Sequence, residues 1–237
     1  MKKLYFVIIL LFTFTLVTSA KKPTNELSFI QKIIKKNNGK ISSSTQLIIV
    51  YNKNLKSHIA KVLCLEKING KWQLIFPSVN TAIGKKGFAK LDQKKEGDLK
   101  TPTGLFPLAL IFGYSFSVDT KMPYKQAKDN DFWVDDPESD QYNKWVSGKI
   151  NAKSAERMKR KDHLYKYGIV VEYNVNPIIK GKGSAMFFHI WRYKNRSSAG
   201  CVVMNEKNIL RIIKWLDKNK KPLVIMGTTE ILLNTKL

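Results

Sequence analysis

The 237-residue sequence predicts a mainly β domain with a few helices. Short runs rich in β-branched and aromatic residues recur along the chain, a pattern typical of strands. Apolar residues at helical spacing are confined to one segment near the start and one near the end. Hydrophobic residues make up 43% of the chain, enough to bury the core of one domain, which excludes a disordered protein.

The first twenty residues predict a secretory signal peptide. Two lysines precede an uncharged run of 14 residues, Leu4–Val17, and the small residues Thr, Ser and Ala occupy positions 18–20. This run is shorter than the ~20 residues that span a bilayer, and no cysteine follows it for lipid attachment. We therefore expect cleavage after residue 20, export to the periplasm or cell envelope, and no stable membrane anchor afterwards.

The expected mature chain opens with a helix and continues into a β-meander. Ile30, Ile33 and Ile34 predict a helix over 25–38 within a helical lead-in at 21–44. The Asn69-Gly70 pair predicts a hairpin turn. Strands are predicted over residues 46–52, 59–68 and 71–77.

The rest of the chain reads as one domain, 45–237, without repeats or a linker. Residues 82–107 are rich in Gly, Lys and Pro but lack the spacing of a phosphate-binding loop. The long, irregular stretch 111–151 is expected to border a binding cleft. Further elements are predicted as strands at 168–173 and 185–191, a helix capped by Asn205, and a closing strand at 222–226.

The net charge of +24 comes from 37 lysines and five arginines scattered along the chain. Base readout and bidentate phosphate clamps favour arginine, so this bias and the export signal argue against nucleic-acid binding. A generally basic, solvated surface is one interpretation. Attraction to anionic envelope polymers is the other, and both stay open.

Two cysteines and three histidines are the candidates for nucleophilic or metal chemistry. Cys64 lies in a strand-like run and is most simply a small buried residue. Cys201 follows a Ser-Ser-Ala-Gly turn, twelve residues after His189 at the end of an apolar strand. Side by side, they would form a thiol–imidazole pair, with backbone N–H groups of Gly200 and Cys201 as an oxyanion hole. A core histidine and a buried cysteine are the alternative, and no metal-binding spacing occurs.

Three motifs carry a resemblance to a known family. A Thr-Pro-Thr-Gly-x-Phe signature within Gly97–Pro107 is followed by Phe188-His189 and by a Ser-x-Gly-Cys box at 198–201. In this order they resemble the L,D-transpeptidase catalytic domain (YkuD-type), over roughly residues 45–227. Three further segments resemble a bacterial subgroup of this superfamily, and they begin at Ser154, Tyr167 and His189.

The resemblance implies a β-sandwich or barrel fold in the cell envelope and peptidoglycan stem peptides as substrate. It implies Cys201 as nucleophile and His189 as its base, oriented by the Ile190 carbonyl, with Gly200 in the oxyanion hole. It implies no metal or organic cofactor.

Two positions depart from the family pattern, which often has Ser-His-Gly-Cys and an arginine two residues after the cysteine. Ala199 replaces that histidine and Val203 replaces that arginine. Arg192 is the substitute we expect to bind a substrate carboxylate, although an ordinary surface arginine is the alternative. The expected substrate-binding residues are Arg192, Trp191, Tyr114 and Ser198.

Together these features predict an exported, monomeric cysteine L,D-transpeptidase that crosslinks stem peptides through a Cys201 thioester. If water attacks the thioester, the same site is an L,D-carboxypeptidase. A non-catalytic module that binds envelope glycans is the third interpretation. A catalytic Cys201 is expected to be accessible with a lowered thiol pKa, whereas a binding module needs neither.

Overall fold

A computed structural model describes residues 25–237, so the predicted signal peptide lies outside the described residues. Its helices and strands, in chain order, are α1 (Asn25–Ile41), β1 (Gln46–Asn52), β2 (Ile59–Ile68), β3 (Lys71–Leu74), β4 (Val79–Ala82), β5 (Gly104–Gly113), β6 (Tyr124–Gln126), β7 (Asp131–Val134), β8 (Trp145–Ser147), β9 (Ala155–Arg157), β10 (Tyr167–Val171), β11 (Phe187–Ile190), β12 (Val202–Met204), α2 (Glu206–Trp215), a 3-10 turn (Lys218–Lys220), β13 (Leu223–Thr228) and α3 (Thr229–Asn234).

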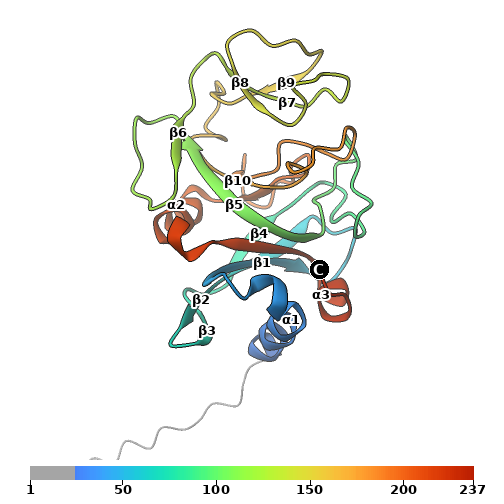
Figure 1. Cartoon of the computed structure of the whole chain (residues 1–237), viewed down its shortest axis with the longest axis vertical. Helices are drawn as coiled ribbons and strands as arrows, with labels where there is room; N and C mark the ends of the chain where they lie inside the picture. Colours follow the sequence, from blue (N-terminus) through green and yellow to red (C-terminus); the bar gives the residue numbers. More distant parts are fainter. Residues whose placement is uncertain (1–24) are drawn as a thin grey trace, which may run out of the picture.

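Eight strands close into a barrel, which confirms the predicted mainly β fold (Figure 1). The order around the barrel is β1-β13-β5-β10-β11-β12-β4-β2, and β2 pairs again with β1. The pairs β1–β13 and β11–β12 are parallel, and the other barrel pairs are antiparallel. A separate three-stranded sheet, β8-β7-β9, lies above the barrel in Figure 1.

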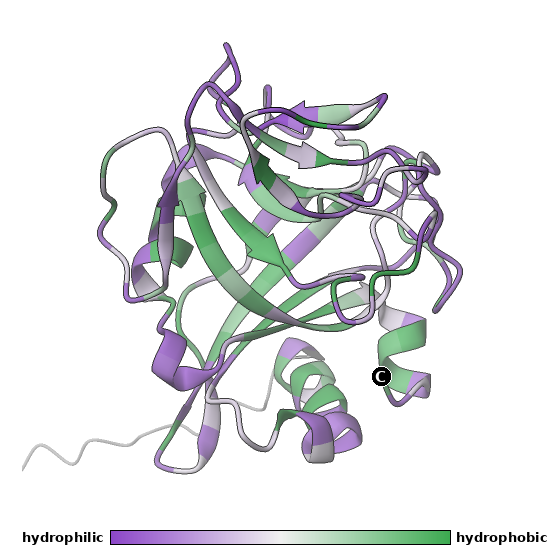
Figure 2. Cartoon of the chain, turned by 45° about the horizontal axis from the view of Figure 1, so that its top comes forward, coloured by the Kyte–Doolittle hydropathy of each residue, from purple (hydrophilic) through white to green (hydrophobic). Residues whose placement is uncertain are grey.

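Alternating side chains on the barrel strands enter different hydrophobic clusters. Ile48 and Val50 point to a cluster shared with α2, whereas Leu47 and Ile49 pack with α1 and α3. On the opposite side, the outward residues of β5, β10 and β11 pack against Trp133 of the small sheet. The barrel strands are accordingly mostly hydrophobic in Figure 2.

Several elements of the structure agree with the sequence predictions, some of them to the exact residue. The strands at 46–52 and 59–68 have the predicted bounds, and β2 and β3 form a hairpin through Asn69-Gly70. Both turn residues have positive φ, as the hairpin turn requires. The Asn205 side chain caps α2 by accepting from the N–H of Asn208.

Other elements differ from the prediction. Helix α1 continues through Gly39 to Ile41, because Ile41 is fully buried and packing outweighs the helix-breaking sequence. Strand β5 begins within the stretch 82–107 that is rich in Gly, Lys and Pro, and it contains Pro107. The stretch 111–151 holds β6, β7 and β8 as short strands. No helix within 25–237 has the length and apolar character of a membrane span.

Candidate active site

Parallel pairing of β11 and β12 places His189 and Cys201 on one face of the barrel. His189 is the register partner of Val203, and Cys201 lies two residues before Val203. Because strand side chains alternate, Cys201 and Val203 point to the same face as His189. Both His189 and Cys201 line one cavity on this face. The structure thus places the two residues in the lining of the same cavity.

His189 is held in one orientation by backbone and aromatic contacts. Its Nδ1 lies 2.9 Å from the carbonyl oxygen of Ile190, so Nδ1 carries a proton and Nε2 is left as the basic nitrogen. The ring of Tyr165 packs edge-on against the imidazole at a centroid distance of 4.9 Å. The side chain is only 7% exposed, and this burial lowers its pKa from 6.5 to about 4. A neutral imidazole is therefore the resting form at neutral pH.

The Cys201 thiol is less accessible than the sequence analysis expects. Cys201 is 8% exposed, and its Sγ donates to the carbonyl of Ala185 at 3.2 Å. Burial raises the pKa of the thiol, contrary to the lowered value expected of an accessible nucleophile. The physical reason is that Cys201 packs within the outer hydrophobic cluster of the barrel. The resting thiol is protonated, so attack requires a base at the moment of reaction.

The Cys201 loop is held against the Thr-Pro-Thr-Gly segment. The Thr101 hydroxyl donates to the carbonyl of Gly200 at 2.6 Å and accepts from the N–H of Gly84. A Cβ at Gly84 would lie 2.5 Å from the carbonyl oxygen of Leu99, so this close approach requires glycine. The Thr-Pro-Thr-Gly segment thus fixes the position of the backbone next to Cys201.

The expected oxyanion hole is only half available. The N–H of Gly200 donates to the Ser198 hydroxyl at 3.1 Å, and that hydroxyl donates to the Cys201 carbonyl at 2.5 Å. Ser198 therefore braces the turn, and it also lines the His189 cavity. Within residues 25–237, the N–H of Cys201 has no hydrogen-bond acceptor and is free to stabilise an oxyanion.

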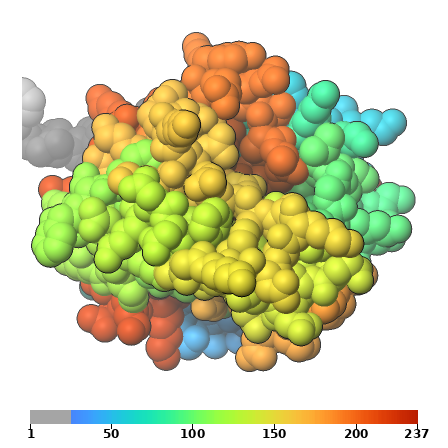
Figure 3. Space-filling view, turned by 90° about the horizontal axis from the view of Figure 1, so that it is seen from above, coloured from blue at the N-terminus to red at the C-terminus, as the bar shows by residue number. Residues whose placement is uncertain are grey.

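Two cavities meet at Cys201. One, of about 270 Å³, contains His189, and the other, of about 210 Å³, extends to Ala185 and Pro102. The residues common to both linings are Glu156, Ala199 and Cys201. The small sheet and its connections cover this side of the molecule, as the green and yellow segments in Figure 3 show. A substrate bound across Cys201 would therefore occupy both cavities.

The cavity that contains His189 is basic. It is lined by Arg160, Arg192 and Arg196, and Trp191 also lines it. Arg160 forms a two-point ion pair with Asp162 at 2.9 and 3.0 Å, whereas Arg192 reaches Asp162 by one contact at 3.3 Å. The Arg192 side chain is 56% exposed, so its guanidinium retains donors for a ligand carboxylate.

Tyr114 does not line either cavity. Its hydroxyl donates to the carbonyl of Asp162 at 3.0 Å and accepts from the N–H of Arg160 at 3.2 Å. Tyr114 thus holds the loop that carries Arg160, because both hydrogen bonds join its hydroxyl to that loop. A direct contact of Tyr114 with substrate stays a prediction.

The second cavity is acidic and contains a residue that the sequence analysis did not select. Glu156 lies in β9, lines both cavities and accepts a hydrogen bond from the Tyr165 hydroxyl. Burial raises the pKa of its carboxyl group. Glu96 and Asp135 line the same cavity, and one Asp135 carboxylate oxygen is buried without a hydrogen-bond partner among the described residues.

Three residues of the site were not among the predicted ones: Glu156 and Arg160 come from β9 and the loop after it, and Arg196 comes from the loop between β11 and β12. Glu156 stands in the Ser154–Met158 segment that carries the resemblance, and this was the signal for it. Arg160 and Arg196 had no such signal. Long-range packing brings Arg160 to the cavity, whereas Arg196 reaches it from the loop between β11 and β12.

Comparisons with known proteins identify a family for this chain. Residues 57–226 match the family model described as YkuD, L,D-transpeptidase catalytic domain. No curated protein matches the sequence. A solved structure, the helical cell shape determining protein Pgp2 from Campylobacter jejuni, matches at 17% identity and a TM-score of 0.40. That match covers 87% of this chain and 59% of the Pgp2 chain, so this chain spans less than two thirds of the length of Pgp2.

Proposed function

The chain belongs to the YkuD family of L,D-transpeptidase catalytic domains, and on this premise we propose that it is an exported cysteine L,D-transpeptidase of peptidoglycan stem peptides. The observation that carries the proposal is the shared cavity of Cys201 and His189, with Nδ1 of His189 held by the Ile190 carbonyl. Export rests on the sequence pattern of residues 1–20.

The proposed first step is attack of Cys201 Sγ on the carbonyl carbon of an L,D-peptide bond. Nε2 of His189 removes the thiol proton as the S–C bond forms, because the resting thiol is protonated. The N–H of Cys201 stabilises the oxyanion. His189 then returns the proton to the amine of the departing D-residue, and a thioester remains on Cys201.

The second step transfers the acyl group to an amine of a neighbouring stem peptide. The amine attacks the thioester carbonyl, His189 takes the amine proton, and the proton passes to Sγ as the S–C bond breaks. The product is a crosslink, and the free thiol is regenerated. If water replaces the amine, the product is a shortened stem and the reaction is an L,D-carboxypeptidase reaction.

The arginine-lined cavity suits the carboxylate of the departing D-residue. That residue leaves beside His189, and Arg192 lines the same cavity with exposed donors. A guanidinium can bind a carboxylate through two parallel hydrogen bonds. Arg192 therefore takes the role that Val203 cannot supply.

Intact-mass analysis of the protein incubated with a soluble stem peptide tests this function. We expect an adduct of the peptide minus its terminal D-residue in the wild type and in Cys64→Ala, and none in Cys201→Ala. Products are then separated by mass: a crosslinked dimer shows the transpeptidase, and a shortened monomer shows the carboxypeptidase.

The raised pKa of the Cys201 thiol is the one observation that favours a non-catalytic glycan-binding module instead. Absence of any adduct in the wild type, together with retained binding to peptidoglycan, would select that alternative.

A further inference from the structure

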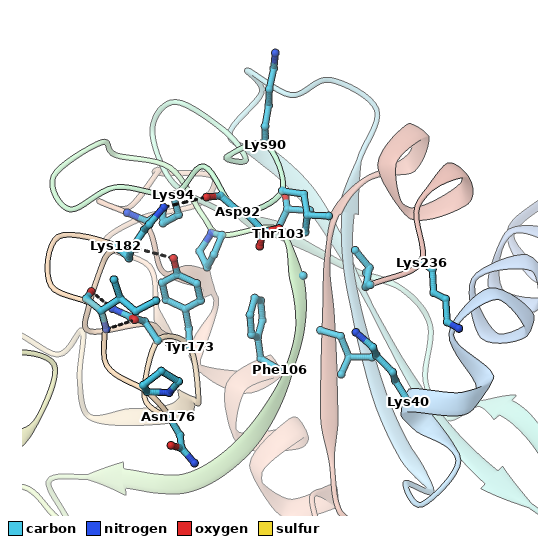
Figure 4. A pocket seen from close by; sticks show the side chains of 18 residues that line it. Lys40, Lys90, Asp92, Lys94, Thr103, Phe106, Tyr173, Asn176, Lys182 and Lys236 are labelled. Carbon is cyan, nitrogen blue, oxygen red and sulfur yellow. Dashed lines mark hydrogen bonds between the residues drawn. The ribbon is translucent and has the colours of Figure 1, made fainter.

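A lysine-rich hollow lies beside the candidate active site and plays no part in the steps above. Its volume is about 650 Å³, larger than either cavity at Cys201. We define the lysine groove by the four exposed lysines that line it and come from separate segments: Lys40, Lys90, Lys182 and Lys236. In Figure 4, Lys40 and Lys236 approach from one side and Lys182 from the other.

The charges of the groove are largely uncompensated. None of its four lysines is within salt-bridge distance of a carboxylate in residues 25–237. A fifth lining lysine, Lys94, is paired with Asp98 at 2.8 Å. Asp92 is the acidic side chain that lines the hollow. The excess of ammonium groups therefore favours an anionic ligand.

An aromatic pair forms the floor between the lysines. Phe106 and Tyr173 meet edge-to-face with their ring centroids 5.3 Å apart, and Figure 4 shows both rings between the two groups of lysines. The Tyr173 hydroxyl donates a hydrogen bond to the carbonyl of Lys182. The rings thus offer half-buried apolar surface, on which the C–H faces of sugar rings can pack.

The lysine groove is continuous with the Cys201 cavity. Lys94, Pro102 and Tyr173 line both the groove and the cavity that contains Cys201 and Glu156. A chain-like ligand in the groove would therefore place a pendant group at the thiol. Lysine ammonium groups act as mobile point charges, which suits acidic groups spaced along a polymer better than one fixed bidentate contact.

From these contacts we infer that the groove binds the glycan strand together with the acidic stem peptides that it bears, and so delivers a stem to Cys201. This inference rests on the proposed function for the identity of the pendant group. The strand supplies sugar rings for the Phe106–Tyr173 floor, and the stems next to the reacting one supply carboxylates for the lysines. The protein would then act on polymer more efficiently than on free stem peptide.

Co-sedimentation with insoluble peptidoglycan tests the groove, using two variants of equal charge. The groove variant changes Lys40, Lys90, Lys182 and Lys236 to Gln. The control variant changes four exposed lysines outside the groove to Gln: Lys53, Lys61, Lys71 and Lys207. Each variant lowers the net charge by the same amount. Thermal melts confirm folding, and the pairs Lys40/Lys236 and Lys90/Lys182 serve as double variants if the quadruple variant fails to fold.

We expect the groove variant to bind peptidoglycan roughly tenfold more weakly than the wild type, and the control variant to lose much less. Binding should also fall with added salt, less steeply in the groove variant. Equal weakening of both variants, or no weakening of the groove variant, overturns the inference. Groove-dependent binding that is tighter to a soluble phosphodiester polymer than to peptidoglycan overturns the assignment to the glycan strand.

Activity assays separate this inference from the proposed function. On a soluble stem peptide, the groove variant should match the wild type, whereas on polymer its kcat/KM should fall with its binding. An inactive wild type refutes the proposed function, and the sedimentation result alone then shows whether the groove binds peptidoglycan. An active wild type with unchanged polymer kinetics in the groove variant refutes the groove alone.

Discussion

The pH dependence of acylation provides a direct test of His189 as the base. Burial lowers the pKa of His189 from 6.5 to about 4, and only the neutral imidazole can take the thiol proton. At pH 5.5, about 97% of the imidazole is neutral with a pKa near 4, against about 9% with a pKa of 6.5. We therefore expect kcat/KM for thioester formation to be nearly constant from pH 7 to 5.5.

The assay measures the rate of the Cys201 adduct by intact mass at half-unit pH steps from 4 to 8. Circular dichroism at each pH shows that the protein stays folded. A roughly tenfold loss of kcat/KM between pH 7 and 5.5, with the fold intact, would refute the reasoning, because it would place the base at the ordinary histidine pKa.

The same burial predicts a change in stability with pH. The unfolded chain protonates His189 near pH 6.5, whereas the folded protein resists protonation until about pH 4. The contribution of His189 to the free energy of unfolding is therefore fully present above pH 6.5. It is lost as pH falls towards 4, by about 3 kcal/mol in total. Urea unfolding of the wild type and of His189→Gln measures the difference, and a difference that stays constant across this window contradicts the prediction.

Three further predictions concern neighbouring residues. Cys201→Ala and Cys64→Ala should each lower the free energy of unfolding by roughly 1 kcal/mol, because both thiols are buried. Only Cys201→Ala should abolish acyl transfer, and transfer retained in that variant excludes Cys201 as the nucleophile. Arg192→Ala should lower kcat/KM about fivefold, a modest effect because the side chain is half-exposed, and Arg192→Lys should restore kcat/KM only in part. Unchanged kinetics in both variants would mean that Arg192 is an ordinary surface residue. Tyr165→Phe should lower unfolding free energy by about 1–3 kcal/mol, since it leaves the buried carboxylate of Glu156 without its hydroxyl partner, and an unaltered melting curve would contradict that role.

Local patterns were sufficient to predict the barrel strands near the N-terminus. The hairpin at Asn69-Gly70 and the cap at Asn205 are determined by residues adjacent in sequence, and both match the structure. Strand β5 escaped prediction because its glycine and proline are typical of loops, and pairing with β10 and β13 overrides that local preference.

The site was predictable to the extent that its motifs are local. The Cys201 loop and the strand of His189 are each recognisable in the sequence, and their parallel pairing completes the arrangement. The burial of the thiol was not predictable, because it depends on a cover supplied by β7 to β9, which lie far from Cys201 in sequence. The same holds for the N–H of Gly200, which is engaged by the Ser198 hydroxyl.

The parallel pairing of β1 with β13 has a consequence for how the chain folds. These strands lie at opposite ends of the described chain, in register from Leu47 with Leu223 to Asn52 with Thr228. Barrel closure must therefore wait until almost the whole polypeptide is available, and such non-local pairing makes folding slow. A truncation before Leu223 would expose the unpaired edges of β1 and β5, which invites aggregation. Late closure would also leave the nascent chain without its barrel until synthesis is nearly complete.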